Sequence, residues 1–198
     1  KNLERARYWF TRAADSGNAA AQYQVAVMAS QGAGGPKDEA TVALYYKKSL
    51  QTWKKEADDG DSKAALWAAL VYERKLVPDS SPEKSVPYLL QAAESGNLTA
   101  QGLLAFKYRD GLGVPQDAAK AVEWFEKAAS RKDLGAVMEL GIMFRDGKYL
   151  PPDREKAFHW FEKGAEWKDP YSMAALADML LEGTPSAEQA ARALALYR

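Results

Sequence analysis

A short aromatic motif returns along this chain at a nearly constant interval. The six residues that begin at Trp124 read Trp-Phe-Glu-Lys-Ala-Ala, and a closely similar stretch begins 36 residues later at Trp160. Three further copies start with an aromatic residue in the same place, namely Trp9, Tyr45 and Tyr88. Self-similarity at a period of roughly 20 to 50 residues is typical of solenoids, in which each copy is one supersecondary unit. The sequence therefore predicts a repeat protein.

Each copy has the pattern of two helices, A and B. Helix A carries apolar or small residues three and four apart, as in Ala121, Trp124, Phe125, Ala128 and Ala129. On a helix of 3.6 residues per turn these positions form one stripe. Helix B holds a small residue at one fixed position, which is filled by Ala21, Ala64, Ala100, Ala136 and Ser172. We therefore expect the two helices to approach closely there, with large residues of A packed against small residues of B.

Glycine and aspartate mark the ends of the predicted helices. Gly17 and Gly96 suit the left-handed residue that ends helix A, whereas Lys132 and Lys168 fill that turn less favourably in the fourth and fifth copies. Glycine also ends helix B, at Gly111 and Gly147, and prolines come after both. The residues expected to cap the next helix A are Asp38, Asp117 and Asp153, with Ser81 and Pro82 serving the third copy.

The rhythm breaks once, because Tyr45 and Tyr88 stand seven residues further apart than the other pairs. Seven residues are about two helical turns, so they lengthen a helix without rotating the residues beyond it. We predict that helix A of the second copy runs from Asp38 to about Asp58 and projects past its neighbours. The connector at residues 75–79 also departs from the others, since it lacks both glycines.

The repeats together form one all-α repeat domain, which spans residues 1–198. Its predicted copies are residues 2–37, 38–80, 81–116, 117–152 and 153–185, and a first helix at 186–198 completes the chain. Both Lys1 and Arg198 fall inside helix patterns, so we expect a fragment of a longer array. Phe10, Leu196 and Tyr197 then have no neighbouring repeat, and further chain or self-association is expected to cover them.

Composition limits the classes of partner. Lys plus Arg and Asp plus Glu each total 27, and this balance argues against nucleic acid or an anionic membrane bound through bulk charge. No apolar run reaches the roughly 18 to 20 residues of a membrane helix. Cysteine is absent, which excludes disulfides and thiolate metal sites and suits either redox compartment.

A helix with the pattern A-x-x-W-F/Y-x-K-A-A, a Gly-Asn turn and a G-x-G-V-P-x-D connector resembles the Sel1-like repeat family, a relative of the tetratricopeptide repeats. The clearest connector is 111–117, and the resemblance covers essentially the whole chain. It implies a right-handed α/α solenoid that serves as a protein-interaction scaffold in signalling, secretion or envelope assembly. For a bacterial source it favours a periplasmic or secreted location over a cytoplasmic one. One branch of the family is rich in cysteine and linked to β-lactam binding. Nothing from that branch carries over to this chain, because it has no cysteine.

No catalytic, cofactor or metal constellation is predicted. His159 is the only histidine and stands on the polar side of helix A. The glycine runs at 32–35 and 111–113 come after helices rather than strands, so they are connectors and not phosphate loops. The acidic stretch 58–61 lacks the spaced ligands of a calcium loop, and a helix-ending turn explains it. Asn97 begins a glycosylation sequon, a pattern that also arises by chance.

A partner surface is predicted on helix A. Solenoids of this kind use the A helices as the concave wall. One position opposite the core stripe collects mainly cations, at Arg12, Lys48, Gln91, Lys127 and Lys163. The position four residues earlier holds Tyr8, Leu44, Pro87, Glu123 and His159. Together they form a groove for an acidic peptide or helix; the alternative is a solvated face with ordinary pairs such as Glu123 with Lys127.

The sequence therefore predicts a non-enzymatic scaffold that binds another protein in its concave groove. Two alternatives stay open at this point. The array is either the targeting arm of an enzymatic or ligand-binding domain elsewhere in a longer chain, or a spacer that binds nothing.

Overall fold

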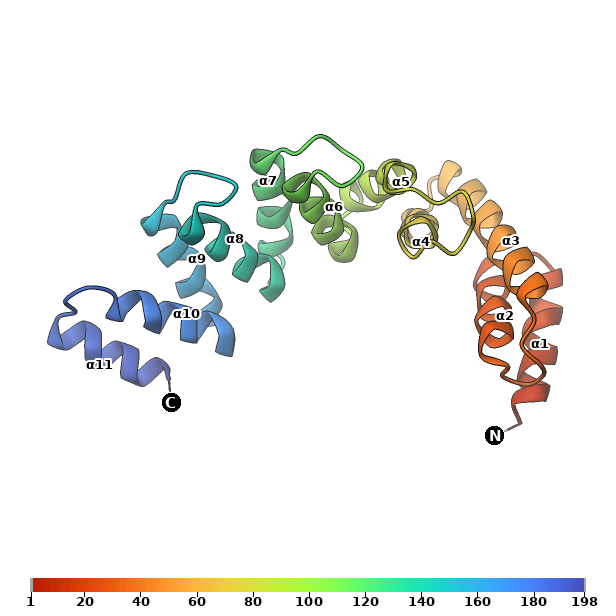
Figure 1. The fold of residues 1–198 in the computed structure, drawn as a ribbon, viewed down its shortest axis with the longest axis horizontal. Helices are drawn as coiled ribbons and strands as arrows, with labels where there is room; N and C mark the ends of the chain where they lie inside the picture. Colours follow the sequence, from red (N-terminus) through yellow and green to blue (C-terminus); the bar gives the residue numbers. More distant parts are fainter. Residues whose placement is uncertain (1, 198) are drawn as a thin grey trace. The chain divides into compact units, whose positions relative to one another are not determined.

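The computed structural model describes residues 2–197, and every regular element in that range is an α-helix (Figure 1). The A helices are α1 (Leu3–Asp15), α3 (Glu39–Asp58), α5 (Pro82–Glu94), α7 (Ala118–Ala129), α9 (Arg154–Glu166) and α11 (Ala187–Leu196). The B helices are α2 (Ala19–Gln31), α4 (Ser62–Glu73), α6 (Leu98–Asp110), α8 (Leu134–Asp146) and α10 (Pro170–Leu181). The predicted all-α solenoid of helix-turn-helix repeats is confirmed. Lys1 and Arg198, expected inside terminal helices, lie outside the described residues.

The helices form two compact units. One consists of the residues up to Ala100 together with Leu112–Val114, and the other of Gln101–Gly111 together with the residues from Pro115 onward. In the first unit, α1 to α5 pack consecutively, each on the next. In the second, α7 to α11 do the same, and the boundary between the units falls within α6. Each unit therefore has a core built from nearest-neighbour helix contacts, as in a solenoid.

The predicted close approach of A and B is confirmed. All five small residues at the fixed position of helix B are buried: Ala21, Ala64, Ala100, Ala136 and Ser172. In the fifth repeat the two helices come so close that Gly164 of α9 leaves no space for a Cβ beside Ser172 of α10. The small residues thus lie where helix A and helix B approach each other.

A second small position on helix B was missed in the sequence. Gly141 of α8 lies against the ring of Phe161 in α9, so tightly that a Cβ on Gly141 would collide with the ring. The same position of helix B holds a buried small residue in each of the five repeats: Ala26, Ala69, Ala105, Gly141 and Ala177. At Gly141 this position takes the second aromatic residue of the next helix A, and it therefore joins the fourth repeat to the fifth.

The predicted caps are confirmed where aspartate supplies them. Asp38 accepts hydrogen bonds from the amides of Ala40 (3.0 Å) and Thr41 (3.3 Å), and its pKa is lowered, first by the side-chain hydrogen bond from Thr41 and then by the backbone bonds. Asp117 and Asp153 each accept from an amide at 3.0 Å, and these backbone bonds lower both pKa values. Ser81 differs: it occupies the N-cap of α5 but its side chain makes no capping bond.

The connectors close onto the start of their own repeat. Gly113 has φ +78°, and a Cβ there would lie 2.5 Å from the carbonyl carbon of Pro82 at the start of α5. Gly34 lies in the same way against the carbonyl of Leu3 at the start of α1. In the second repeat this position is Val77. In the fourth repeat it is Tyr149, so neither of these connectors has the glycine contact.

The long helix of the second repeat is confirmed, since α3 spans 20 residues and is capped by Asp38. The expectation that its extra turns project past their neighbours is wrong for two of their residues. Trp53 is 4% exposed and Ala57 is 1% exposed. The indole of Trp53 stacks on Trp67 of α4, with ring centroids 5.4 Å apart, and meets Tyr23 of α2 at 5.7 Å. The added turns therefore extend the core of the first unit.

Three turns hold a lysine with a positive φ, namely Lys75, Lys132 and Lys168, and the last two end an A helix. Lys132 and Lys168 adopt φ values of 64° and 62°, where the sequence pattern of other repeats places glycine. A non-glycine residue in the left-handed conformation costs about 1 to 2 kcal/mol. Glycine removes this cost, but part of the gain is offset because glycine gives the unfolded chain more conformational entropy. We expect Lys132→Gly and Lys168→Gly each to raise the free energy of unfolding by about 0.5 to 1 kcal/mol, measured by urea denaturation. Glu126→Gly, within helix α7, is the control and should lower it by about 1 kcal/mol.

The destabilisation due to the close contact at Gly113 can be measured separately from that due to its positive φ. Gly113→Ala introduces both left-handed strain and a collision with Pro82, whereas Gly17→Ala (φ +90°) introduces only the strain, because no atom lies within 4 Å of a Cβ there. We expect Gly17→Ala to cost about 1 to 2 kcal/mol and Gly113→Ala to cost about 1 to 3 kcal/mol more. Equal losses in urea denaturation would show that the connector does not need the close approach.

Candidate functional site

The predicted cations of helix A all lie over aromatic rings of their own helix. In the first unit Arg12 lies over Trp9, at 5.7 Å from the ring centroid, and Lys48 lies over Tyr45 at 5.0 Å. In the second unit the same pairing joins Lys127 to Trp124 at 3.7 Å and Lys163 to Trp160 at 5.0 Å. Residues three apart are neighbours on a helix surface, so the repeat itself generates the pairing. We call these four contacts the cation–aromatic pairs.

The cation–aromatic pairs correct one expectation about the surface. Lys127 does not point away from the aromatic residues, because its ammonium lies on the indole face of Trp124. Within the described residues, no ion pair joins Lys127 to Glu123, so the ordinary salt bridge of a solvated face is not what holds this lysine. Lys127 stays exposed while Trp124 is 7% exposed. The ring therefore restricts the lysine and leaves its charge accessible, in a contact worth about 0.5 to 1 kcal/mol.

The third repeat departs from this pattern. Gln91 stands at the cation position of α5, and its side-chain amide donates a hydrogen bond to the carbonyl of Ala57 at 2.6 Å. Ala57 belongs to the added turns of α3. Gln91 therefore ties the end of the long helix to the next helix A, and its amide is engaged within the first unit.

The neighbouring row of predicted residues is exposed throughout. It consists of Tyr8, Leu44, Pro87, Glu123 and His159. Tyr8 and Leu44 are 55% and 49% exposed, which is high for apolar side chains. His159 meets the edge of Trp160, with ring centroids 5.3 Å apart. The first unit thus combines its cations with exposed apolar groups, and the second combines them with a carboxylate and an imidazole.

Residues 2–197 contain neither a cluster of metal ligands nor a membrane-spanning helix. No group of three or more His, Asp or Glu side chains converges there as metal ligands would. The acidic stretch at 58–61 ends α3 and begins α4, where the Asp61 carboxylate caps the amides of Lys63 (2.8 Å) and Ala64 (3.1 Å). None of the helices in this range has both the length and the apolar character needed to cross a bilayer.

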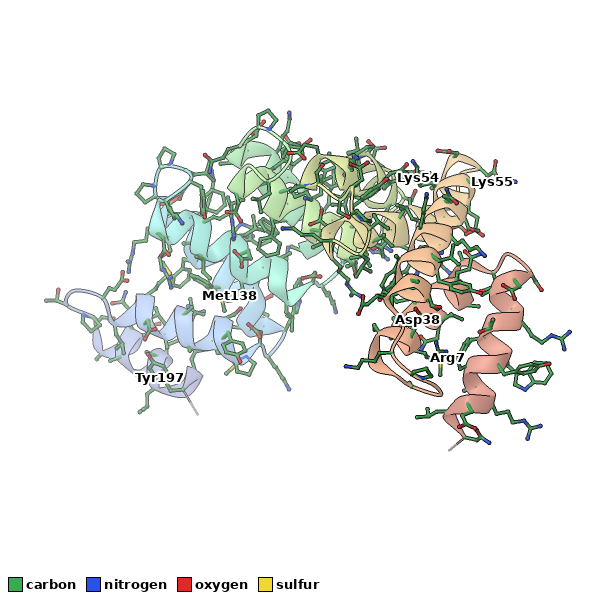
Figure 2. The ribbon with its side chains drawn as sticks, turned by 45° about the vertical axis from the view of Figure 1, so that its right-hand side comes forward. Arg7, Asp38, Lys54, Lys55, Met138 and Tyr197 are labelled. Atoms are coloured by element: carbon green, nitrogen blue, oxygen red, sulfur yellow. The ribbon has the colours of Figure 1, made fainter. Side chains whose placement is uncertain are left out.

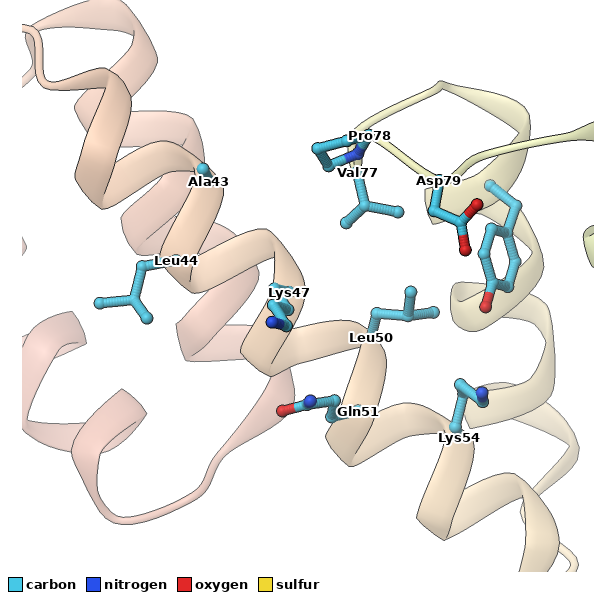
Figure 3. Close-up of a pocket in the computed structure, with 10 residues that line it drawn as sticks. Ala43, Leu44, Lys47, Leu50, Gln51, Lys54, Val77, Pro78 and Asp79 are labelled. Atoms are coloured by element: carbon cyan, nitrogen blue, oxygen red, sulfur yellow. The ribbon is translucent and has the colours of Figure 1, made fainter.

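A groove that the sequence did not predict lies along α3 in the first unit (Figure 3). It has a volume of about 620 Å³. One wall is a row on α3, made of Ala43, Leu44, Lys47, Leu50, Gln51 and Lys54. The other wall consists of Tyr72, Val77, Pro78 and Asp79, from the end of α4 and its connector. We call this the α3 groove; only Leu44 belongs also to the predicted surface.

The α3 groove has an apolar floor and a positively charged edge. Leu50, Tyr72 and Val77 are 8 to 9% exposed. The pKa of Lys54 is raised, first by its electrostatic interaction with Tyr72 and then by that with Tyr88, so its ammonium is fully charged at neutral pH. Asp79 opposes this charge but is itself ion-paired with Lys84.

The signal that marks the groove was present in the sequence. The seven added residues of α3 and the glycine-free connector at 75–79 are the two irregularities of the repeat, and both belong to the second copy. Periodicity reveals that each departs from the pattern. It does not reveal that they face one another, because that depends on how the connector folds back.

The sequence matches a family model for the Sel1 repeat in six segments: residues 1–18, 19–49, 63–97, 99–133, 135–166 and 170–198. No individual curated protein matches it. Two solved structures share its fold at 22% sequence identity. One is a protective antigen of uropathogenic Escherichia coli with an SLR fold, which matches with a TM-score of 0.64 over 98% of this chain and 49% of the antigen. This chain thus spans about half the length of that protein.

The other is a Sel1 repeat protein from Oxalobacter formigenes, with a TM-score of 0.65 over 100% of this chain and 78% of that one. At this level of identity both structures establish the fold alone.

The contribution of a cation–aromatic pair is measurable. Lys127→Gln removes the charge over Trp124 and keeps a side chain of similar length, so we expect the free energy of unfolding to fall by about 0.5 to 1 kcal/mol. Lys168→Gln is the control in the same unit, since Lys168 is exposed and keeps its backbone strain in both forms. Equal effects of the two variants in urea denaturation would contradict a specific contact with the ring.

Proposed function

The chain belongs to the Sel1 repeat family, whose members are commonly protein-interaction scaffolds, and we propose that it is a non-enzymatic scaffold that binds a partner protein on its A helices. The observation that carries this proposal is the set of cation–aromatic pairs. Arg12, Lys48, Lys127 and Lys163 are each placed over a ring by the repeat, so the same chemical group recurs on one face within each unit.

The chemistry of this face favours an acidic partner. A lysine that lies on an indole has already lost part of its rotational freedom, so less entropy is lost when a carboxylate of the partner pairs with it. The exposed Tyr8 and Leu44 offer apolar contacts beside the cations of the first unit. Acidic side chains interspersed with apolar ones match both features. The partner is therefore an acidic peptide or helix, bound through electrostatic steering and modest apolar burial.

The family is generally non-catalytic, and the proposed role needs no chemistry at the site. Its titratable groups on the second unit are His159, Glu123 and the two lysines, which are exposed or half-exposed rather than gathered in a cavity. A catalytic acid or base usually stands in a cleft, where burial and neighbouring charges shift its pKa. Recognition by exposed charge is the function that this arrangement supports.

Charge reversal on the face tests the proposal. The variant Lys48→Glu/Lys127→Glu/Lys163→Glu should lose capture of partner proteins in a crosslinking pull-down from an extract of the source organism, quantified by mass spectrometry against the unmodified chain. Each exposed charge pair contributes up to about 1 kcal/mol, so three reversals should lower capture by up to about a hundredfold. Circular dichroism should show unchanged helicity.

The matched control is Lys55→Glu/Lys132→Glu/Lys168→Glu, which changes the net charge equally at exposed lysines outside the face. Capture should persist in this control. Equal loss in both triple variants would mean that only bulk charge matters, and equal retention would exclude the face as the binding surface. An unmodified chain that enriches no protein would favour the spacer.

A further inference from the structure

The α3 groove lies where the connector of the second repeat differs from those of the first and third. In the first and third repeats, Gly34 and Gly113 let the connector lie directly on the backbone at the start of helix A. Val77 holds that position in the second repeat, and it lines the groove together with Pro78 and Asp79. The connector and α3 thus enclose a groove that is lined with side chains (Figure 3).

The shape of the groove fits a chain segment. Its lining residues on α3 recur every three or four positions from Ala43 to Lys54, so they form one row along the helix. At 1.5 Å per residue this row is about 16 Å long. An extended peptide advances about 3.3 Å per residue, so about five residues fit along it. The volume of about 620 Å³ leaves room for two aliphatic side chains on the apolar floor.

The charges of the groove select the occupant. Lys47 is exposed and makes no ion pair within the described residues, and Lys54 lines the groove beside Tyr72. Asp79 is the acidic group of the lining, and its ion pair with Lys84 offsets its charge. Two cations therefore flank a floor of Leu50, Tyr72 and Val77. Carboxylates on either side of aliphatic residues complement this arrangement.

We propose that the α3 groove is a second binding site, which takes an extended segment of a partner protein in which aliphatic residues are flanked by acidic ones. The inference deepens the proposed function, because it assumes that the chain binds proteins. It is independent of the cation–aromatic pairs, since Lys47 and Lys54 belong to none of them.

The probe is a hexapeptide with blocked ends, in which two leucines are flanked on each side by two glutamates. Binding is monitored by methyl NMR of Leu44, Leu50 and Val77, with the peptide titrated into the millimolar range. We expect saturable shifts of these methyl groups. A peptide with lysines in place of the glutamates, and one with serines in place of the leucines, should each bind at least about tenfold more weakly.

The matched pair of variants is Lys47→Glu and Lys55→Glu, which change the same charge on the same helix. Lys55 is exposed and does not line the groove, and Figure 2 shows it on a different side of α3 from Lys54. Lys47→Glu should weaken binding of the acidic peptide by about tenfold, and Lys55→Glu should leave it within about twofold. Ala43→Trp, which fills the groove from an exposed position, should abolish binding while the circular dichroism spectrum stays unchanged.

Three results would overturn the proposal: no methyl shift in the millimolar range, equal binding of the lysine peptide, or equal effects of Lys47→Glu and Lys55→Glu.

Lys127→Glu/Lys163→Glu separates the two sites. This variant should bind the hexapeptide normally. If the unmodified chain binds the hexapeptide but partner capture does not depend on the cation–aromatic pairs, only the proposed face is contradicted. Loss of peptide binding in this variant would contradict the assignment to the groove.

Discussion

The close packing of aromatic residues on A helices against alanine, glycine or serine on B helices is the contact on which the rest of the structure depends. Phe161 against Gly141 joins two repeats, and Gly164 against Ser172 joins the two helices of one repeat. The later repeats bury most of the apolar stripe of helix A, whereas Trp9 and Phe10 of α1 are 55% and 39% exposed. Stability in such an array accumulates from units and nearest-neighbour interfaces rather than from one central core.

The same aromatic residues also shape the surface. Trp124 and Trp160 each present one face to the core and the other to a lysine three residues later. The aromatic ring that each of these repeats keeps for packing therefore also holds a lysine at the surface. This coupling explains how a stripe of cations arises in a chain whose net charge is zero. The charge is local to one helix face, and compensating carboxylates cap helices, as Asp117 does for α7.

The second repeat shows what a departure from the pattern can do. Its added turns are absorbed by Trp53 stacked on Trp67 and by the bond from Gln91 to Ala57, so the insertion keeps the helices in register. Its connector has Val77 where the first and third repeats have Gly34 and Gly113. In a regular solenoid, the places where a repeat differs from its neighbours are the places where an individual binding site can form. The α3 groove lies at such a place.

The sequence by itself determined the elements of this protein and their phase. The 36-residue period, the positions of Asp38, Asp117 and Asp153 and the 20-residue length of α3 are all local consequences of residue type and spacing. The candidate surface on helix A was partly predictable, because a row of cations is visible in the pattern. Their placement on the rings of Trp124 and Trp160 was not predicted, although a spacing of three residues on one helix already makes them neighbours.

Only the tertiary structure decided the α3 groove and the burial of Trp53. Both depend on residues that are distant in sequence, such as Val77 beside α3 and Trp67 beside Trp53. Periodicity assigns a residue to a face of its helix, but the space opposite that face is set by the volume and backbone path of another segment. A glycine or a valine at position 77 leaves the helix pattern unchanged and alters the shape of the surface beside it.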